Sequence, residues 1–409
     1  MKFVSKIRAM DNRLKLPKVM YISLDGMMEP LGYSQVFKYL EKLSVNHKIT
    51  LISFEKSKDL MREEDLKTLS LKFSKNNITW VKFKYRSGFL GLSRLINLVN
   101  LTLSPIYFLL FNNIRIVHIR SYMPGIAIPL LSIFFKFKLI FDMRGFWADE
   151  RHDRHNWKKK SLKYRFFKRL ETYLLYRAES IITLTHSSQK IICNVFQKKT
   201  SQIHVIPTCV DLEEFKMIKN INTSSKMIIG YLGSVDTAYD FDKFLFLINE
   251  IYYKFNKNIE LRIFTSEEPK IIKKILIDSN LDEIDLTVKF VERKNLTMEI
   301  SKFDFLGFHL KENFSVQASM PTKIAEVLAC GVPIVCNAFN EDIEKLIREK
   351  HVGFIYNSRN SLTKKNYMEI LDLKENIAIH DRCAKVAHDD FSLTNGAHKY
   401  ETIYAELLS

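Results

Sequence analysis

The sequence predicts an α/β protein with two domains, each built around a parallel sheet. Short runs rich in Val and Ile alternate with longer helix-like segments from Val19 onward, as in consecutive βα units. A polar stretch interrupts this alternation at residues 216–226, after which the same pattern begins again. A chain of 409 residues is also longer than one compact core usually organises.

The expected strands follow from these apolar runs. In the first half they are residues 19–24, 49–54, 78–81, 116–119, 138–141, 180–184 and 204–206. In the second half they are residues 227–232, 259–264, 286–290, 303–309, 333–337 and 353–356. Because residues 216–226 lack apolar periodicity, they are the expected linker between domains at 1–215 and 227–390, with a helical tail at 391–409.

Two long apolar stretches, residues 92–111 and 126–141, approach the length of a membrane span. Arg94 and Pro105 interrupt the first, and Pro129 and Lys136 interrupt the second. Both stretches also fit buried helix-then-strand units, which is the interpretation we adopt.

The cysteines and the N-terminus favour a cytoplasmic protein. Cys193, Cys209, Cys330, Cys336 and Cys383 show neither a CxxC pair nor zinc-type spacing, so reduced and mostly buried thiols are expected. Residues 1–19 contain basic residues but no uninterrupted apolar core, and therefore do not predict a signal peptide.

Positive charge is concentrated in the first half of the chain. Residues 1–210 contain 37 Lys or Arg and 15 Asp or Glu, leaving 26 and 31 for the remainder. No acidic residue occurs between Asp65 and Asp142, an interval with eleven Lys or Arg. Such a surface should attract an anionic partner, and a basic nucleic-acid-binding protein is therefore one alternative function.

The segment after the predicted strand at 138–141 is the first candidate site. Asp142, Arg144, Asp149 and Glu150 gather there with Gly145 and Trp147. Ligands of open α/β sheets bind at the carboxyl ends of strands, so we expect a functional cluster, with a salt-bridged loop as the alternative. His118 ends another predicted strand and is a further catalytic candidate, although histidines in such places often have structural roles.

Two further segments favour phosphate and sugar binding. Gly32 and Tyr33 follow the first predicted strand and open a helix, where a glycine lets a ligand approach backbone N–H groups. The pattern of residues 320–333 predicts a helix that carries Lys323 and Glu326 on one face. A carboxylate there can accept two hydroxyl hydrogen bonds, as a ribose would offer, while Lys323 and the helix N-terminus can neutralise a diphosphate.

Together these segments resemble the family 4 retaining glycosyltransferases of the GT-B fold. The resemblance is carried, in the family's order, by the Gly32 turn, the 142–151 loop, the 205–211 stretch with Phe215, and the 321–333 helix. The glycine turn at residues 229–234 and the terminal segment 391–404 add to it. The resemblance implies two Rossmann-like domains that face each other across a cleft, with the terminal helix packing back on the N-terminal domain.

The resemblance also implies roles for individual residues. Glu326 would bind the donor ribose, and the diphosphate would lie near Lys323 and the backbone of Gly233 and Ser234. Pro321 and Thr322 would complete the donor site, and the Gly32–Tyr33 loop would lie near it. Across the cleft, the acceptor would meet the catalytic candidates, namely Asp142, Arg144, Asp149, Glu150 and His118.

Two departures from the family's pattern concern the donor site. Ala318 stands where the family often has a sugar-facing Glu, and the Arg and Lys that commonly follow the second glycine turn are not recognisable after Ser234. Lys243 and Lys311 are the candidate replacements. Departure of the leaving group in such an enzyme needs positive charge or dipoles aimed at the diphosphate, so we expect neither a metal nor a cofactor, the nucleotide-sugar being a substrate.

The resulting expectation is a retaining, metal-independent transferase that moves a sugar to a glycan or lipid-linked acceptor in cell-surface polysaccharide synthesis. A sugar-nucleotide epimerase of the same fold is the second alternative. Residues 157–169 contain seven basic residues, four aromatic residues and no acidic residue, which is typical of an interfacial helix. We therefore expect a cytoplasmic protein that docks on the inner face of an anionic membrane, and we expect no nucleic-acid partner.

Overall fold

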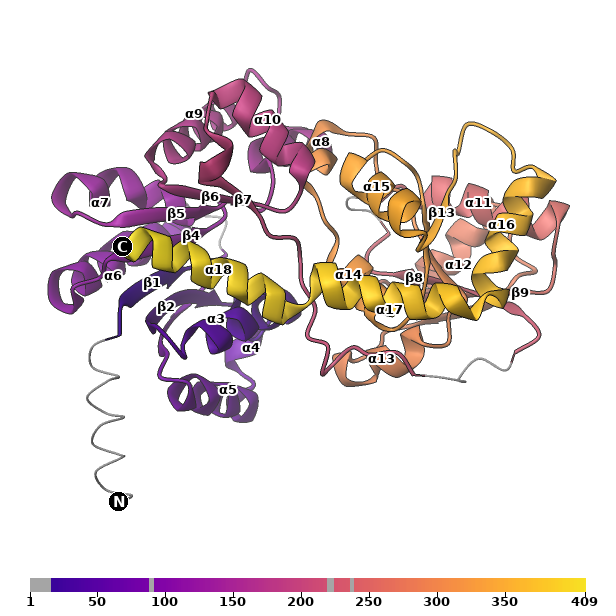
Figure 1. Ribbon diagram of the computed structural model, residues 1–409, viewed down its shortest axis with the longest axis horizontal. Coiled ribbons are helices and arrows are strands. Elements are labelled where there is room, and N and C mark those ends of the chain that lie inside the picture. The colour runs from indigo at the N-terminus through magenta and orange to yellow at the C-terminus, as the bar shows by residue number, and fades with distance from the viewer. Residues whose placement is uncertain (1–15, 88–91, 219–223, 236–238) are drawn as a thin grey trace.

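Two parallel sheets organise the chain (Figure 1). The computed structural model describes residues 16–87, 92–218, 224–235 and 239–409. Among these residues the first sheet has the strand order β3-β2-β1-β4-β5-β6-β7, and the second has the order β10-β9-β8-β11-β12-β13. All strand pairings within the two sheets are parallel, which confirms the predicted α/β class.

Every predicted strand coincides with an observed one, and the ends differ by three residues at most. The first sheet consists of β1 (Lys18–Ile22), β2 (Lys48–Glu55), β3 (Thr79–Lys84), β4 (Ile116–Arg120), β5 (Lys138–Asp142), β6 (Ser180–Thr183) and β7 (Ile203–Val205). The second consists of β8 (Met227–Leu232), β9 (Ile259–Phe264), β10 (Asp285–Lys289), β11 (Phe305–Gly307), β12 (Ile334–Cys336) and β13 (Gly353–Ile355).

Helices cover both faces of each sheet. Around the first sheet lie α2 (Pro30–Gly32), the π-helix η1 (Tyr33–Phe37), α3 (Lys38–Leu43), α4 (Ser57–Leu60), α5 (Glu63–Lys75), α6 (Leu92–Asn112), η2 (Pro124–Ala127), α7 (Ile128–Phe134), α8 (Trp147–His155), α9 (Leu162–Arg177), α10 (His186–Phe196) and η3 (Thr200–Gln202). Around the second lie α11 (Phe241–Lys254), α12 (Pro269–Asp278), α13 (Arg293–Ile300), η4 (Phe314–Ala318), α14 (Thr322–Ala329), α15 (Glu341–Lys350), α16 (Lys364–Glu375) and α17 (Ile377–Phe391).

The central strand β1 shows why its sequence is a continuous apolar run. Val19 and Tyr21 belong to one buried cluster, whereas Met20 and Ile22 belong to another on the opposite face of the sheet. Successive side chains of a strand point to opposite faces, so a strand covered on both sides must be apolar at every position.

The last helix, α18 (Leu393–Leu408), returns the chain from the second sheet to the first (Figure 1). The hydroxyl of Ser392 caps α18 by accepting a hydrogen bond from the backbone N–H of Asn395, so the chain turns between α17 and α18 at this residue. Beyond the turn, apolar side chains of α18 are buried with Val19 and Tyr21 of β1; they are Leu393, Ala397, Tyr400, Ile403 and Tyr404. One helix pair thereby links both halves of the molecule.

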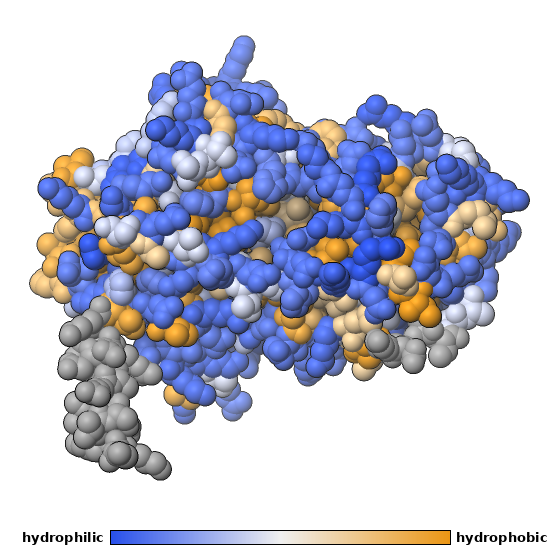
Figure 2. All heavy atoms as spheres, in the orientation of Figure 1, coloured by the Kyte–Doolittle hydropathy of each residue, from blue (hydrophilic) through white to orange (hydrophobic). Residues whose placement is uncertain are grey.

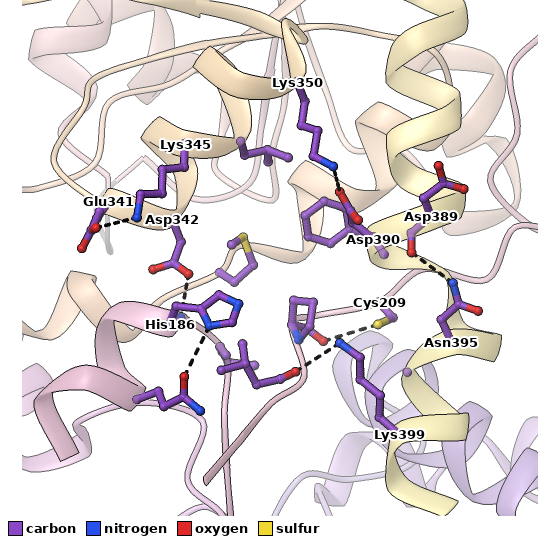
Figure 3. A pocket seen from close by; sticks show the side chains of 18 of the residues that line it. His186, Cys209, Glu341, Asp342, Lys345, Lys350, Asp389, Asp390, Asn395 and Lys399 are labelled. Atoms are coloured by element: carbon purple, nitrogen blue, oxygen red, sulfur yellow. Dashed lines mark hydrogen bonds and ion pairs between the residues drawn. The ribbon is translucent and has the colours of Figure 1, made fainter. Parts of the chain in front are cut away.

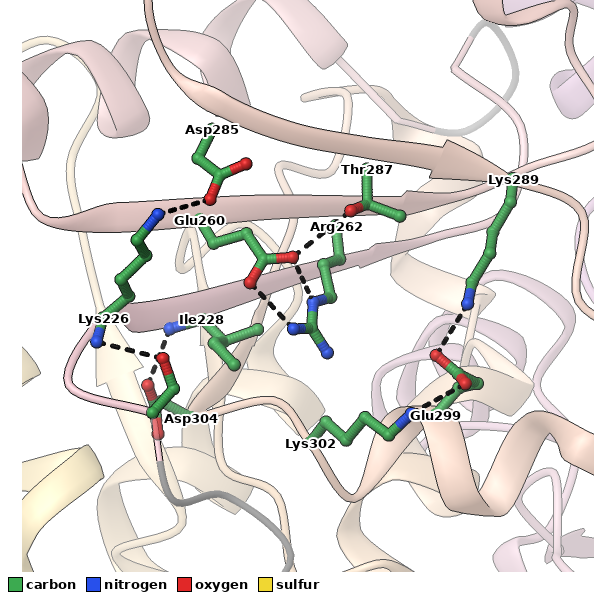
Figure 4. Close-up of polar contacts among 11 residues, drawn as sticks. Lys226, Ile228, Glu260, Arg262, Asp285, Thr287, Lys289, Glu299, Lys302 and Asp304 are labelled. Carbon is green, nitrogen blue, oxygen red and sulfur yellow. Dashed lines mark hydrogen bonds and ion pairs between the residues drawn. The ribbon is translucent and has the colours of Figure 1, made fainter.

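Charged side chains cover the outer strands of the second sheet (Figure 4). On β9, Arg262 donates two hydrogen bonds to the carboxylate of Glu260, at 2.6 and 2.7 Å. Lys226 pairs with Asp285 of β10 at 2.6 Å, and Lys289 pairs with Glu299 at 2.9 Å. Charge along an edge strand such as β10 opposes pairing with another chain.

The helix α6 departs from the expectation of a buried element. It connects β3 to β4 and contributes Leu101 to the core, as a crossover helix should. Yet the segment Ser93–Asn112 is long and apolar enough to cross a membrane by length and composition, and only 17% of its most apolar window is buried. The prediction of a helix is therefore correct, whereas the prediction of its burial is wrong.

Candidate functional site

A cavity of about 350 Å³ opens at the carboxyl ends of β8, β9 and β10 in the second sheet. Its walls come from the segments that follow β8, β9 and β10 and from the start of α14. The lining residues are Leu232, Gly233, Ser234, Tyr239, Phe264, Thr265, Ser266, Phe290, Val291, Leu296, Thr322, Lys323 and Glu326. The edge of a parallel sheet where strand order reverses is where such folds bind ligands.

A helix start and the open space beside a glycine turn can serve an anion in this cavity. Gly233 has φ +102°, and a Cβ added there would meet no atom within 4 Å, so the residue borders open space, while its own N–H donates a 2.9 Å hydrogen bond to the carbonyl of Phe264. Opposite it, α14 begins at Pro321, which makes no side-chain capping bond, and Thr322 and Lys323 of the first turn line the cavity. Uncapped N–H groups at a helix start attract negative charge.

Glu326 contributes the carboxylate of the cavity and belongs to an ion-pair bridge. Arg293 of α13 lies with its Nη1 3.2 Å from Oε1 of Glu326 and its Nε 2.6 Å from Oε1 of Glu214. The same guanidinium lies 5.0 Å from the ring centre of Phe215. Burial raises the pKa of Glu326, and Arg293 acts in the opposite direction. This bridge joins the cavity to the segment that leaves the first domain.

Lys323 was expected to lie near the diphosphate, but its amine is bonded within the protein. Its Nζ donates a 2.7 Å hydrogen bond to the carbonyl of Leu232 and lies 3.5 Å from the ring centre of Tyr239. Burial lowers the pKa of this amine well below its usual range. Lys323 therefore supports the turn before Gly233, and its cation would be stabilised chiefly by neighbouring rings.

The two domains meet beside this cavity. Phe146, after β5, packs against Phe314 of η4 with ring centres 5.0 Å apart. Asp153 of α8 accepts a 3.1 Å hydrogen bond from the backbone N–H of Ser315. Ala318 is 1% exposed and belongs to the core cluster of the first domain. A Glu at that position would have to bury a charge in this contact, which explains the departure from the family's pattern.

The first carboxylate of the loop after β5, that of Asp142, is bonded to other side chains of the protein. Asp142 is fully buried, and its Oδ2 accepts hydrogen bonds from Arg120 at 3.3 Å and from the hydroxyl of Tyr400 at 3.2 Å. Arg120 also donates to Asp25 at 2.8 Å. Arg144 has φ +61°, a strained conformation for a residue with a side chain, and its Nη1 lies 3.8 Å from Asp142. Asp142 is therefore part of a structural ion pair, which was the alternative to a functional role.

Asp149 and Glu150 have separate environments on α8. Asp149 is 6% exposed and accepts hydrogen bonds from Tyr164 at 2.6 Å and Lys168 at 3.0 Å, both on α9. Glu150 pairs with Arg154 at 2.9 Å, and its side chain is 34% exposed. Of these two acidic residues, Glu150 is the one available to a substrate.

The catalytic assignment of His118 does not fit its location. The ring is fully buried, and Nδ1 lies 2.8 Å from the hydroxyl of Tyr404. Burial lowers the pKa of His118 well below its usual range, so the ring is uncharged at neutral pH. Because α18 covers this end of β4, His118 packs inside the first domain and has no path to a substrate.

The Gly32–Tyr33 turn also has a packing explanation. A Cβ at Gly32 would lie 2.0 Å from the carbonyl oxygen of Gly26, so the glycine allows the loop to fold onto itself. The nearby N–H groups of Met27 and Met28 donate to the buried carboxylate of Glu55 at 2.9 and 3.2 Å. Glycine is needed here for backbone contact within the chain.

A larger hollow of about 510 Å³ lies between the domains on the side of α10, α15 and α18 (Figure 3). Its charged side chains neutralise one another: Lys345 pairs with Glu341 at 2.8 Å and Lys350 with Asp390 at 3.3 Å. Asp342 accepts hydrogen bonds from the backbone N–H groups of His186 and Ser187 at the start of α10. With these groups already paired, the smaller cavity is the better candidate for an anionic ligand.

Comparison with known proteins addresses the family and the fold. The model of a family described as Glycosyltransferase Family 4 matches residues 36–214. No curated protein matches the chain in sequence.

Among solved structures, the fold is similar to sucrose-phosphate synthase from Thermosynechococcus elongatus, with TM-score 0.69 and 12% identity over 96% of this chain and 99% of that one. It is also similar to HepE from Anabaena in complex with UDP-glucose, with TM-score 0.67 and 13% identity over 95% and 99%. WaaG, a glycosyltransferase involved in lipopolysaccharide biosynthesis, matches with TM-score 0.63 and 11% identity over 94% and 99%.

The chain has the GT-B fold, and residues 36–214 match the glycosyltransferase family model. In this GT-B fold, five of the predicted donor-site residues line one cavity: Gly233, Ser234, Thr322, Lys323 and Glu326. Pro321 only starts the helix, and Lys311 lines a neighbouring hollow of about 670 Å³ that shares Ser234 and Tyr239. Lys243 lies 3.5 Å from Asp240 and lines neither.

Other residues of the site were missed in the sequence. Arg293, Glu214 and the aromatic wall of Tyr239, Phe264 and Phe290 were not predicted. The signal available for the wall was its position, because each of these residues ends or follows a predicted strand. Arg293 offered no such signal, since its two carboxylate partners lie 79 and 33 residues away in sequence.

The buried ion pair at Asp142 predicts a stability defect. Asp142→Ala should lower the free energy of unfolding by about 3 kcal/mol, because it leaves Arg120 buried without one of its two partners. Glu150→Ala, at a partly exposed site, should change it by about 0.5 kcal/mol or less. Urea denaturation of the two variants measures the difference, and equal stability of both would contradict the structural role of Asp142.

The positive φ of Gly233 predicts a binding defect. Gly233→Ala should weaken UDP binding about tenfold or more, because the new Cβ strains the turn and enters the cavity. Gly145→Ala is the matched control, since Gly145 also has a positive φ (+141°) and room for a Cβ but does not line the cavity. Calorimetric titration with UDP should show the loss in Gly233→Ala alone; a similar loss in both variants would argue against a local effect.

Proposed function

We propose that this enzyme transfers a sugar, with retained anomeric configuration, from a nucleotide-sugar to a glycan or lipid-linked acceptor. The observation that carries the proposal is the joint placement of a carboxylate, a positive-φ glycine turn and an uncapped helix start around one cavity. This set matches a ribose linked to a diphosphate.

The cavity divides into three parts that correspond to the parts of a nucleotide. Glu326 accepts hydrogen bonds from the two ribose hydroxyls. The N–H groups of the first turn of α14 bind the diphosphate, and the open space beside Gly233 admits it. Phe264, Phe290 and Leu296 form the apolar wall against which the base packs.

The reaction breaks the bond between the anomeric carbon and the diphosphate oxygen, and the acceptor oxygen forms the new bond on the same face. The departing phosphate takes the proton of the acceptor hydroxyl. The backbone N–H groups at the start of α14 stabilise the negative charge that develops on the diphosphate. Lys311, in the adjoining hollow that shares Ser234, is the nearest candidate for an additional cation.

The donor is proposed to be a UDP-sugar, since the structurally similar HepE was solved with UDP-glucose. The acceptor belongs to a cell-surface polysaccharide, a role supported by the similarity to WaaG. The enzyme works in the cytoplasm at the inner face of the membrane. Exposed basic residues of the 157–169 segment support this location, as does Leu162 of α9, which is 83% exposed.

The direct test of the donor is a thermal-shift screen against UDP-, GDP- and ADP-sugars. Saturation at about 100 times the dissociation constant stabilises a protein by about 2.7 kcal/mol, so one nucleotide should raise the melting temperature by several degrees. An epimerase of the same fold is the alternative activity. Incubation with a radiolabelled donor separates the two: transfer places label on the acceptor, whereas epimerisation leaves it on the nucleotide-sugar.

The ribose assignment predicts a specific loss. Glu326→Gln should weaken UDP binding at least tenfold, because hydrogen bonds to a charged group contribute about 1.5–3 kcal/mol each. Glu292→Gln, at an exposed carboxylate one residue before Arg293, should bind UDP as the unaltered enzyme does. A thermal shift with UDP that is the same in Glu326→Gln and the unaltered enzyme would rule out this role for Glu326.

Metal independence is a separate prediction. The proposed stabilisation of the diphosphate uses backbone N–H groups, so transfer activity should survive EDTA. The rate of label transfer with and without the chelator is the measurement. Complete loss that manganese or magnesium restores would overturn this part of the mechanism.

A further inference from the structure

The outer sides of α6 and α7 form an exposed apolar surface at the end of the molecule farthest from the second sheet (Figures 1 and 2). We call it the α6–α7 face. Its residues are 38–74% exposed and comprise Leu95, Leu98, Val99, Leu103, Tyr107, Leu110, Phe111, Leu130, Ile133 and Phe134. Apolar patches of this kind mark sites of interaction with another surface.

The arrangement of these residues is regular. Leu95, Val99, Leu103, Tyr107 and Phe111 recur at intervals of four, which aligns them along one side of α6. The opposite side, including the buried Leu101, packs on the core of the first sheet. A surface helix normally presents polar residues to solvent, so an outward apolar stripe of this length requires a partner.

Basic side chains border the face. Arg94 lies in the first turn of α6, and Arg115 follows its last turn. Arg115 also lines a hollow of about 600 Å³ with Lys136 and Lys138, which follow α7. All four side chains are exposed, and the sequence has no acidic residue from position 66 to position 141.

The positive charge around the α6–α7 face distinguishes between two possible partners, a second copy of the chain and an anionic bilayer. A symmetric dimer would place the same face of a second copy against it, and the basic borders of both copies would then repel one another without acidic partners. An anionic bilayer offers an apolar interior and negatively charged headgroups together. The complementarity therefore favours a membrane.

The fold also determines how α6 can meet the bilayer. Its inner side belongs to the core, and it connects neighbouring βα units of the first sheet. Crossing the membrane would remove Leu101 and its neighbours from that core. The helix can instead lie in the plane of the surface and immerse only its outer stripe.

We propose that the α6–α7 face inserts into the interfacial layer of an anionic membrane, with Arg115, Lys136 and Lys138 contacting lipid phosphates. Insertion makes attachment resistant to salt, which attachment through the basic 157–169 segment alone would not be. The α6–α7 face lies outside the donor cavity, so its binding to membranes can be tested without measuring sugar transfer.

The test is flotation of the full-length protein with vesicles of equal parts phosphatidylglycerol and phosphatidylcholine. The quadruple variant Leu103→Ser, Phe111→Ser, Ile133→Ser, Phe134→Ser should lose at least tenfold in partitioning, and the remaining bound fraction should dissociate in high salt. The matched control replaces four exposed apolar residues elsewhere, Met61→Ser, Leu71→Ser, Val195→Ser and Ile277→Ser. It should bind as the unaltered protein does.

Two further measurements make the outcome decisive. Both quadruple variants should keep the melting temperature of the unaltered protein within a few degrees, because the replaced side chains are exposed. Replacing Lys158, Lys159, Lys160 and Lys163 by Glu should reduce binding at low salt but leave the salt-resistant fraction. The proposal would be overturned if the α6–α7 variant partitions into vesicles as the unaltered protein does. It would also be overturned if light scattering shows a dimer for the unaltered protein and a monomer for the variant.

Discussion

The burial of α18 against the first sheet is the contact on which the arrangement of the molecule depends. Leu393, Ala397, Tyr400, Ile403 and Tyr404 are each at most 5% exposed in that contact. Burial of a large apolar side chain contributes about 1.5–3 kcal/mol, so this contact holds α18 firmly. Since α17 belongs to the second domain and α18 to the first, the helix pair fixes how the two domains face each other.

The same contact explains how the polar residues of the first domain are used. The hydroxyl of Tyr400 reaches Asp142, and that of Tyr404 reaches His118, so α18 covers the ends of β4 and β5 from one side. Asp149 is likewise used to hold α9. Asp142 and Asp149 of the acidic loop therefore serve packing within the first domain, and Glu150 is the loop's more exposed carboxylate. The groups suited to bind a phosphorylated ligand lie on the second domain, around Gly233 and α14.

The fold and the donor cavity were largely predictable from the sequence, for one physical reason. A strand buried on both faces must be apolar throughout, and the residues at its carboxyl end then lie at the ligand-binding edge. That reasoning located Gly233 and Ser234 after β8, and the helix predicted at residues 320–333 located Lys323 and Glu326.

What the sequence did not disclose depends on contacts between distant segments. Residue spacing within β4 and β5 could not show that a helix 286 residues later would enclose His118. Nor could it show that Lys323 would be enclosed among aromatic rings, where burial lowers the pKa of its amine. For α6, apolar composition correctly indicated that its side chains need an apolar environment, but composition does not say whether the protein itself supplies that environment.

The central claim is that one cavity, at the carboxyl ends of the second sheet, binds the nucleotide of the donor. An experimental structure of the enzyme with UDP tests it most directly. The account predicts the ribose hydroxyls on Glu326, the diphosphate beside Gly233 and against the N–H groups at the start of α14, and the base beside Phe264 and Phe290. UDP bound in the larger hollow beside Lys345 and Lys350, with the Glu326 cavity empty, would contradict it.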